Sequence, residues 1–229
     1  MPDALLRQSR QKRRALLRPL LRVPTIWHLR DNWAGALVGR MADLGPHRII
    51  ANSRATAAFL QKDMKHPHKV VVVHNPVDVA EFSPEGDTFP LETAGPRVGL
   101  VAALTGFQPQ MAPWYRALDV VVNASIRPEP FGRTLLEAMA CGKAVVGPNA
   151  GGIPEFVQHG KKGLLYEMGN VGTLAEAVLP LLRETAWRQK LGSAGRETAV
   201  RRFAPQPQAQ AILRILLESS LGVLTRKIC

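Results

Sequence analysis

Glu129 and Glu137, two glutamates eight positions apart, are the residues of this chain whose type and spacing point most directly to chemistry. Gly132 lies between them, after an apolar stretch and before a helical pattern, so a strand, a turn and a helix start follow one another. Backbone N–H groups at a helix start attract an anion, and carboxylates accept hydrogen bonds from neighbouring hydroxyls. The segment therefore indicates binding of a phosphate beside a polyol, the combination that a sugar nucleotide presents.

An alternative role for the same two carboxylates is that of the acid and the base of a glycosidase. That reaction needs surroundings that push the pKa values of the two groups apart. The glycine turn favours an anion near one of them, which suits a donor phosphate better than hydrolysis. Two glutamates without any ligand are the third interpretation, because the spacing taken alone carries little information.

Apolar, β-branched segments alternate with helical patterns along the chain, and short connections join them. This alternation is typical of an α/β fold with parallel sheets. Residues 76–96 are rich in proline and glycine and predict a boundary between two such patterns. The predicted strands are 25–30, 48–52, 69–73, 98–103, 119–123, 144–147 and 163–166. The predicted helices are 33–44, 53–62 with Ser53 as N-cap, 111–117, 133–141, 171–184, 185–202 and 207–221.

The composition, with 229 residues and 46% apolar side chains, fits one large or two small globular domains. The net charge of +12 suits acidic partners such as nucleotide phosphates or anionic lipid. The alternative is that the positive charge only keeps the protein soluble. No RNA- or DNA-reading motif accompanies the charge, so we expect no nucleic-acid partner. Cys141 and Cys229 provide neither a disulfide framework nor a metal spacing, which indicates a reducing, cytoplasmic setting.

Residues 1–22 alternate leucines with arginines and predict a basic amphipathic helix that bends near Pro19. Such a helix binds an anionic membrane surface; its alternative is a helix packed on a sheet with a solvated arginine face. The segment lacks the apolar core of a secretory signal, and no apolar run in the chain is long enough to span a bilayer. We therefore expect a cytoplasmic protein that can work at the inner face of the membrane.

The segment from Arg127 to Glu137 resembles the Glu-x7-Glu motif of the retaining family 4 glycosyltransferases, also called glycosyl transferases group 1. Members of this family have the GT-B fold, which consists of two Rossmann-like domains. The resemblance runs in order from about residue 24 to residue 205. Its further matches lie at 74–78, 114–119, 137–143, 151–157 and 163–166. It implies two Rossmann-like parallel-sheet domains in this chain, both incomplete.

The resemblance also implies roles for single residues. Glu137 matches the glutamate that binds the nucleotide ribose, and Glu129 matches the one that holds hydroxyls of the donor sugar. The turn between them matches the backbone that meets the sugar and the phosphate. Its donor-binding residues are Phe131, Gly132, Arg133 and Thr134.

Three more residues enter through the resemblance. Gly151 and Gly152 match a loop beside the donor, for which a simple tight turn is the alternative. His28 ends a predicted strand and matches a histidine near the donor, so we predict His28 and Glu129 as catalytic residues; the alternative for His28 is a structural histidine. The chain has no Asp-x-Asp motif and no metal-ligand spacing of histidines. We expect no metal and no cofactor, with a UDP- or GDP-linked sugar as substrate.

Two departures from the family pattern lead us to expect a truncated protein with an internal deletion. The chain starts too late to hold the first glycine-rich loop of the N-terminal domain, and after Arg97 to Leu104 the sequence passes directly to Thr105. About two strand–helix units, roughly 60 residues, are missing there by the size of such units. With them go the arginine and lysine that bind the donor diphosphate in the family. The incomplete sheet predicts either poor independent stability or a partner protein that covers it.

The expected domains are a basic helix at 1–22, a remnant of the acceptor-side domain at 23–80, a linker at 81–96, a shortened nucleotide-sugar-binding domain at 97–204, and a C-terminal helix and tail at 205–229. The expected activity is retaining transfer of a hexose from a nucleotide sugar to a glycan or lipid acceptor, impaired by the missing phosphate ligands. The alternative is a non-catalytic remnant that binds a nucleotide or a protein partner. A sugar-nucleotide epimerase shares the architecture, but no residue favours it.

Overall fold

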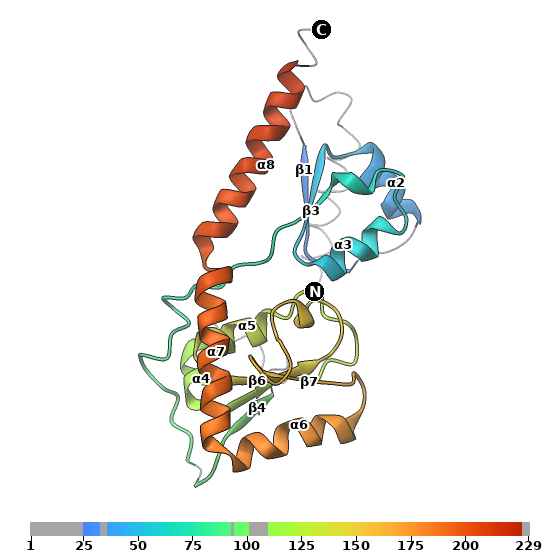
Figure 1. The fold of residues 1–229 in the computed structure, drawn as a ribbon. Helices are drawn as coiled ribbons and strands as arrows, with labels where there is room; N and C mark the ends of the chain where they lie inside the picture. Colours follow the sequence, from blue (N-terminus) through green and yellow to red (C-terminus); the bar gives the residue numbers. More distant parts are fainter. Residues whose placement is uncertain (1–24, 33–35, 93, 101–109, 226–229) are drawn as a thin grey trace. The chain divides into compact units, whose positions relative to one another are not determined.

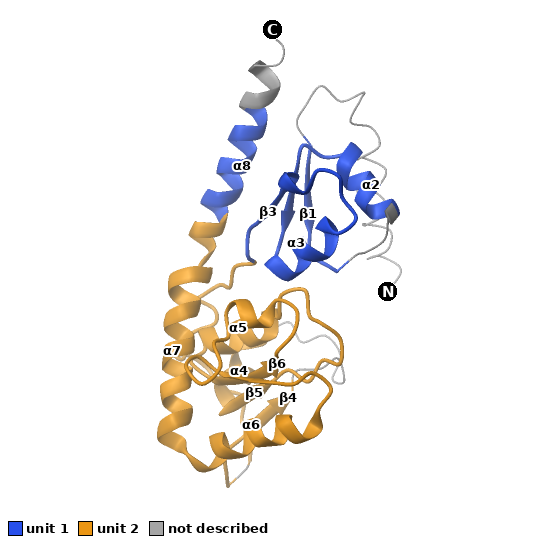
Figure 2. Cartoon of the chain, turned by 45° about the vertical axis from the view of Figure 1, so that its right-hand side comes forward, with its two compact units in different colours: residues 1–74, 209–229 blue, residues 75–208 orange. Residues whose placement is uncertain are grey.

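The structure is a computed structural model, and it describes residues 25–32, 36–92, 94–100 and 110–225. The predicted amphipathic helix at 1–22 lies outside these ranges. So do the end of the predicted strand at 98–103, the Thr105 region of the expected deletion, and Cys229. The chain divides into two compact units, which Figure 2 colours separately. Unit 1 comprises residues 1–74 and 209–229, and unit 2 comprises residues 75–208.

Unit 1 contains a three-stranded parallel sheet in the order β1 (Ile26–Leu29), β2 (Arg48–Ala51) and β3 (Val70–Val72). Helices α2 (Ala36–Leu44) and α3 (Arg54–Gln61) contribute Ala42 and Leu60 to the apolar cluster on one face of this sheet. On the other face, the part of α8 (Pro205–Thr225) that belongs to unit 1 adds Ile215 to a second cluster. The sequence prediction of three parallel strands is confirmed.

The start of α3 shows how local chemistry sets an element's boundary. The side chain of Ser53 accepts a hydrogen bond from the backbone N–H of Thr56 at 2.9 Å, as predicted for an N-cap. The Ser53 hydroxyl also donates to the Thr56 hydroxyl, and both residues are fully buried. The helix therefore begins where its free N–H groups find acceptors.

Unit 2 contains a four-stranded parallel sheet in the order β4-β5-β6-β7. Its strands are β4 (Val98–Leu100), β5 (Val120–Val122), β6 (Ala144–Pro148) and β7 (Leu164–Tyr166). Its helices are α4 (Ala112–Ala117), α5 (Arg133–Ala140), α6 (Val171–Arg183) and α7 (Thr185–Phe203), with short 3-10 turns at Pro67–Lys69 in unit 1 and Ile153–Glu155 here. Each of these four strands and four α-helices lies within a few residues of its predicted range.

Both faces of the inner strands β5 and β6 are buried, which explains their valine runs, whereas Val98 and Leu100 of the edge strand β4 are exposed. Val121 and Val145 point into the cluster formed with α4, α5 and the end of α7. Val120 and Val146 point into the cluster on the other face, where α6 contributes Leu181. Figure 1 shows α5 and α6 on opposite sides of the strands. The sheet is therefore a rigid platform for the loops that leave its carboxyl ends.

The segment expected as a linker, 81–96, falls within unit 2. Phe82 is buried in the main cluster of this unit, and Phe89 stacks on Trp114 with ring centroids 3.7 Å apart. These aromatic contacts hold a proline-rich segment against the domain. The division between the two units comes earlier, after His74.

Among the described residues, no helix has both the length and the apolar character needed to cross a membrane.

Candidate functional site

The predicted donor site lies at the carboxyl ends of β5 and β6 in unit 2. Asn123 directly follows β5, the loop to Glu129 comes next, and α5 begins after Gly132. The loop that leaves β6 carries Gly151 and Gly152. Ligands of open α/β sheets bind in this position, outside the carboxyl ends of the strands.

Glu129 is held by two neighbours from its own loop. Ser125 donates its hydroxyl to Oε1 of Glu129 at 2.7 Å, and the side-chain amide of Asn123 donates to the same oxygen at 3.2 Å. Asn123 is buried and is itself fixed, because its Oδ1 accepts the backbone N–H of Ser125. Both donors reach the same oxygen, so the carboxylate has a defined orientation.

The two predicted glycines bring their loop against the Glu129 segment. The backbone N–H of Gly152 donates to the carbonyl oxygen of Glu129 at 2.9 Å. A Cβ on Gly151 would lie 2.2 Å from that same oxygen, and one on Gly152 would lie 2.5 Å from the carbonyl oxygen of Pro130. Only glycines permit this approach. The structure therefore joins four of the predicted site residues, Glu129, Phe131, Gly151 and Gly152, in adjoining loops.

Gly132 is the N-cap of α5 and has a φ of 90°, the left-handed region that favours glycine. The preceding Phe131 is buried and packs on Phe156, with centroids 5.3 Å apart. Its side chain thus anchors the turn in the core, and only its backbone belongs to the site. Arg133 and Thr134 follow in the first helical turn, where backbone N–H groups lack acceptors within the helix.

Glu137 lies one turn into α5 and has a partner on each oxygen. Tyr115 donates its hydroxyl to Oε2 at 3.1 Å, and Arg133 lies 3.1 Å from Oε1. The Glu137 side chain is only 13% exposed, whereas that of Arg133 is 58% exposed. Burial raises the pKa of Glu137, and the Arg133 charge and the Tyr115 hydrogen bond oppose that rise.

His28 belongs to unit 1. It lies next to the last residue of β1, where it pairs in register with Ile50. Its Nε2 is buried and has no hydrogen-bond partner in the described part of the chain. Burial lowers the pKa of this histidine, and the nearby Arg30 charge lowers it further. A neutral imidazole with a free nitrogen is chemically suited to bind a polar group.

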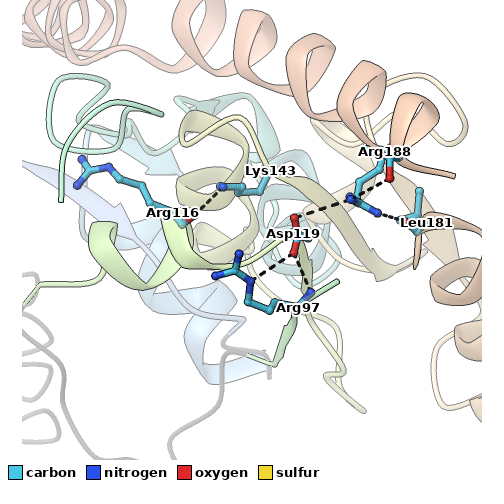
Figure 3. A network of polar contacts seen from close by, with 7 residues as sticks. Arg97, Arg116, Asp119, Lys143, Leu181 and Arg188 are labelled. Carbon is cyan, nitrogen blue, oxygen red and sulfur yellow. Dashed lines mark hydrogen bonds and ion pairs between the residues drawn. The ribbon is translucent and has the colours of Figure 1, made fainter. Parts of the chain in front are cut away.

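A second polar network of unit 2 lies at the opposite, amino ends of the strands (Figure 3). Asp119 accepts the backbone N–H of Arg97 at 2.8 Å and forms ion pairs with Arg97 and Arg188. Lys143 donates to the carbonyl oxygen of Arg116 at 2.8 Å, and burial lowers its pKa. These contacts join the strand starts and lie away from the candidate site.

Sequence reasoning missed three residues that position the two glutamates: Tyr115, Asn123 and Ser125. Asn123 had a usable signal, because a polar residue directly after a buried strand points to the ligand side of the sheet. Tyr115 had none, since its contact with Glu137 spans 22 residues and depends on how α4 packs on α5. Within the described ranges, no three histidine, cysteine or acidic residues gather as metal ligands.

Residues 90–184 match the protein family described as "Glycosyl transferases group 1". This range includes all the predicted site residues of unit 2. A D-inositol 3-phosphate glycosyltransferase of Thermomonospora curvata is 32% identical over 171 residues, 72% of this chain and 38% of that protein. The N-acetyl-alpha-D-glucosaminyl L-malate synthase of Bacillus anthracis is 41% identical over 75 residues, 33% of this chain and 20% of that protein. The chain thus spans well under half of each of these relatives.

Solved structures share the fold. Anabaena HepE in complex with UDP has a TM-score of 0.80 at 20% identity, with 92% of this chain and 77% of HepE covered. WaaG, a glycosyltransferase involved in lipopolysaccharide biosynthesis, has a TM-score of 0.64 at 12% identity, with 83% and 75% covered. The family match over residues 90–184 and the two parallel-sheet units together identify a group 1 glycosyltransferase domain with the GT-B fold in this chain.

Proposed function

We propose that this protein transfers a hexose from a nucleotide sugar to a glycan or lipid acceptor, with retention of the anomeric configuration. The observation that carries the proposal is the pair Glu129 and Glu137, each oriented by its own hydrogen bonds on either side of the Gly132 helix start. The relatives support a glycosyl-transfer reaction, and the HepE structures with UDP and with UDP-glucose support a nucleotide-sugar donor.

In this proposal the two carboxylates bind hydroxyl groups of the donor. Glu137 accepts hydrogen bonds from the ribose hydroxyls, and Glu129 accepts them from the sugar. Backbone N–H groups of Arg133 and Thr134 face the diphosphate, where the helix start stabilises negative charge. His28 is proposed as a catalytic residue whose unpartnered Nε2 can form a hydrogen bond with a polar group.

The proposed chemical step needs no nucleophile from the protein. The bond between the anomeric carbon and the donor phosphate oxygen breaks, and the acceptor oxygen forms the new bond on the same face. The acceptor proton passes to the departing phosphate oxygen. Orientation of the donor and stabilisation of the leaving diphosphate then account for the rate. We propose that no metal or cofactor takes part, and that the reaction occurs at the cytoplasmic face of the membrane.

A second candidate function is binding of the nucleotide or of a partner protein without transfer. The observation that favours it is the stretch between Arg97 and Arg116, which contains no lysine or arginine. Cationic side chains are the usual partners of a diphosphate. A protein lacking them at this point would bind the ribose and the sugar but stabilise the leaving group poorly.

The test is calorimetric titration of the purified protein with UDP and with GDP, alongside the Glu137→Gln variant. Glutamine keeps the size of the side chain and can still accept from Tyr115, but it removes the charge and replaces the oxygen that pairs with Arg133 by an amide donor. We expect binding of one nucleotide and a loss of about tenfold or more in the variant, the usual effect of removing a charged hydrogen-bond acceptor. A folded protein that binds neither nucleotide would overturn the transfer function and the nucleotide-binding form of the second function.

Release of UDP or GDP from a nucleotide sugar, followed in the presence of candidate acceptors, separates the two functions. Turnover that is lost in Glu137→Gln supports transfer. Nucleotide binding with no turnover for any donor supports the binding function instead.

A further inference from the structure

A groove of about 290 Å³ lies in unit 2 between the loop that precedes β7 and the C-terminal half of α7. Four cationic side chains line it, together with a single carboxylate. The lining residues are Gln158, Lys161, Lys162, Ala194, Glu197, Thr198, Arg201 and Arg202. A hollow with this surplus of positive charge favours a small anionic ligand.

The cations of the groove differ in their partners. Arg201 pairs with Glu197 at 3.0 Å, and Arg202 lies over the Phe203 ring, 5.1 Å from its centroid. Within the described residues, neither Lys161 nor Lys162 has an ion pair. The helix dipole accounts for arginines in the last turn of α7, but it does not account for two adjacent lysines in a loop.

The loop that carries the two lysines, residues 158–163, is held in place by backbone hydrogen bonds. The carbonyl oxygen of Gln158 accepts the backbone N–H groups of Lys161 and Lys162, at 3.1 and 2.9 Å. Gly160 donates to the carbonyl oxygen of Gly163 at 2.9 Å, which closes the turn. The loop also lies close to α7, because a Cβ on Gly195 would lie 3.4 Å from the carbonyl oxygen of Lys162. Little backbone ordering is therefore needed when a ligand binds.

The groove is separate from the candidate donor site. Its loop precedes β7 and so lies at the amino end of that strand, whereas Glu129 and Glu137 lie at the carboxyl ends of β5 and β6. The volume is at the small end of the range for ligand sites. It suits a phosphate or diphosphate group but not a whole sugar nucleotide.

We propose that this groove is a second anion site, which binds a phosphoryl group through Lys161, Lys162 and Arg202. The phosphoryl group comes either from an anionic lipid headgroup or from a soluble phosphorylated molecule. In both cases the three cations donate charge-assisted hydrogen bonds to the phosphoryl oxygens. In the first case, the site holds the C-terminal half of α7 against a membrane.

The test uses the full chain, with pyrophosphate as the soluble probe and vesicles of phosphatidylglycerol in phosphatidylcholine as the lipid probe. The variant is Lys161→Gln/Lys162→Gln. Its matched control is Arg183→Gln/Lys190→Gln, which removes two exposed positive charges of unit 2 outside the groove. Pyrophosphate titrations are followed by NMR of the backbone amides of Lys161, Lys162 and Arg202, which report on the groove and not on the donor site.

We expect perturbation of these amides by pyrophosphate, co-sedimentation with the anionic vesicles, or both. The lysine variant should bind about tenfold more weakly than the control, as expected for loss of two charge-assisted contacts. Binding of pyrophosphate alone identifies a soluble ligand. Binding of vesicles alone identifies a headgroup only where the lysine variant loses it, because residues 1–22 are also expected to bind anionic vesicles. The proposal is overturned if neither probe binds, or if the control variant loses as much binding as the lysine variant.

Discussion

The hydroxyl of Tyr115 donates to Oε2 of Glu137 and thereby fixes the buried side of a carboxylate whose other oxygen faces the surface. Tyr115 is fully buried, while Arg133, on the other oxygen, is 58% exposed. The Arg133 contact is therefore more easily displaced than the Tyr115 contact. A ligand hydroxyl can replace the solvent-exposed arginine at low cost, because exposed ion pairs contribute little, whereas the tyrosine stays in place and orients the carboxylate for the incoming group.

Tyr115→Phe should weaken nucleotide binding and raise the pKa of Glu137 further. The Tyr115 hydrogen bond stabilises the ionised carboxylate and so lowers this pKa, and its loss leaves burial less opposed. NMR titration of the Glu137 carboxyl carbon measures the shift. Tyr166→Phe is the matched control, because Tyr166 donates to the carbonyl oxygen of Asn123 and does not contact Glu137. Both variants should lose about 0.5–1.5 kcal/mol of stability, and equal pKa values in both would contradict the assignment.

Glu137→Gln should increase stability at neutral pH while it weakens nucleotide binding. Burial raises the pKa of Glu137 above its ordinary value of 4.5, so the folded state binds this proton more tightly than the unfolded state. In the parent protein, this stabilising contribution is therefore fully present below about pH 4.5 and is lost as the pH rises through the folded pKa. Urea unfolding at several pH values measures the effect. The stability gain of the variant should grow with pH from near zero in acid, and a gain independent of pH would disprove the titration of Glu137.

The two glutamates and their turn could be predicted from the sequence because they are local. The two glutamates are only eight positions apart, and a glycine and a helix start lie between them. These local features fix the position of Glu129 relative to Glu137 almost without tertiary structure. The alternation of valine runs and helical patterns likewise predicted both parallel sheets, since strands with two buried faces have a distinctive composition. Phe131 shows the limit: the motif includes it, yet its side chain serves the core.

The packing of segments that are distant in sequence could not be predicted. The approach of Gly151 to the carbonyl oxygen of Glu129 joins two loops and depends on the register of β5 with β6. The attachment of residues 81–96 to unit 2 depends on where Phe82 and Phe89 find partners. Proline and glycine content indicates a loop but says nothing about which surface the loop covers.

Gly151→Ala should destabilise unit 2 more than Gly160→Ala does. Both glycines have a left-handed φ, 63° and 73°, so alanine costs about 1–2 kcal/mol at either position from the backbone alone. Only at Gly151 would the new Cβ collide with backbone, 2.2 Å from the Glu129 carbonyl oxygen; at Gly160 nothing lies within 4 Å. Chemical unfolding of the two variants measures the difference. Equal losses would mean that the two loops do not pack as described.

Ser125→Ala should affect the sugar and spare the nucleotide. The Ser125 hydroxyl donates to Oε1 of Glu129 at 2.7 Å, and its removal leaves only Asn123 to orient that carboxylate. If Glu129 binds the donor sugar, affinity for the intact nucleotide sugar should fall about three- to tenfold, as for loss of one orienting hydrogen bond. Affinity for the free nucleotide should stay unchanged. Parallel calorimetric titrations with both ligands give the comparison, and an equal loss for both would place Glu129 on the nucleotide instead.

Asp119→Ala should destabilise the protein and leave nucleotide binding intact. Asp119 accepts the Arg97 backbone N–H and lies within ion-pair distance of Arg97 and Arg188 at the amino ends of the strands (Figure 3). Its loss leaves the half-buried Arg97 and the more buried Arg188 without their carboxylate, which costs about 1–3 kcal/mol for groups of this kind. Lys143 also loses the Asp119 charge that opposes the lowering of its pKa. Thermal unfolding of the variant measures the loss of stability, and nucleotide titration of the same variant measures the affinity. A change in nucleotide affinity in the folded variant would contradict the prediction and show that the two ends of the sheet are coupled.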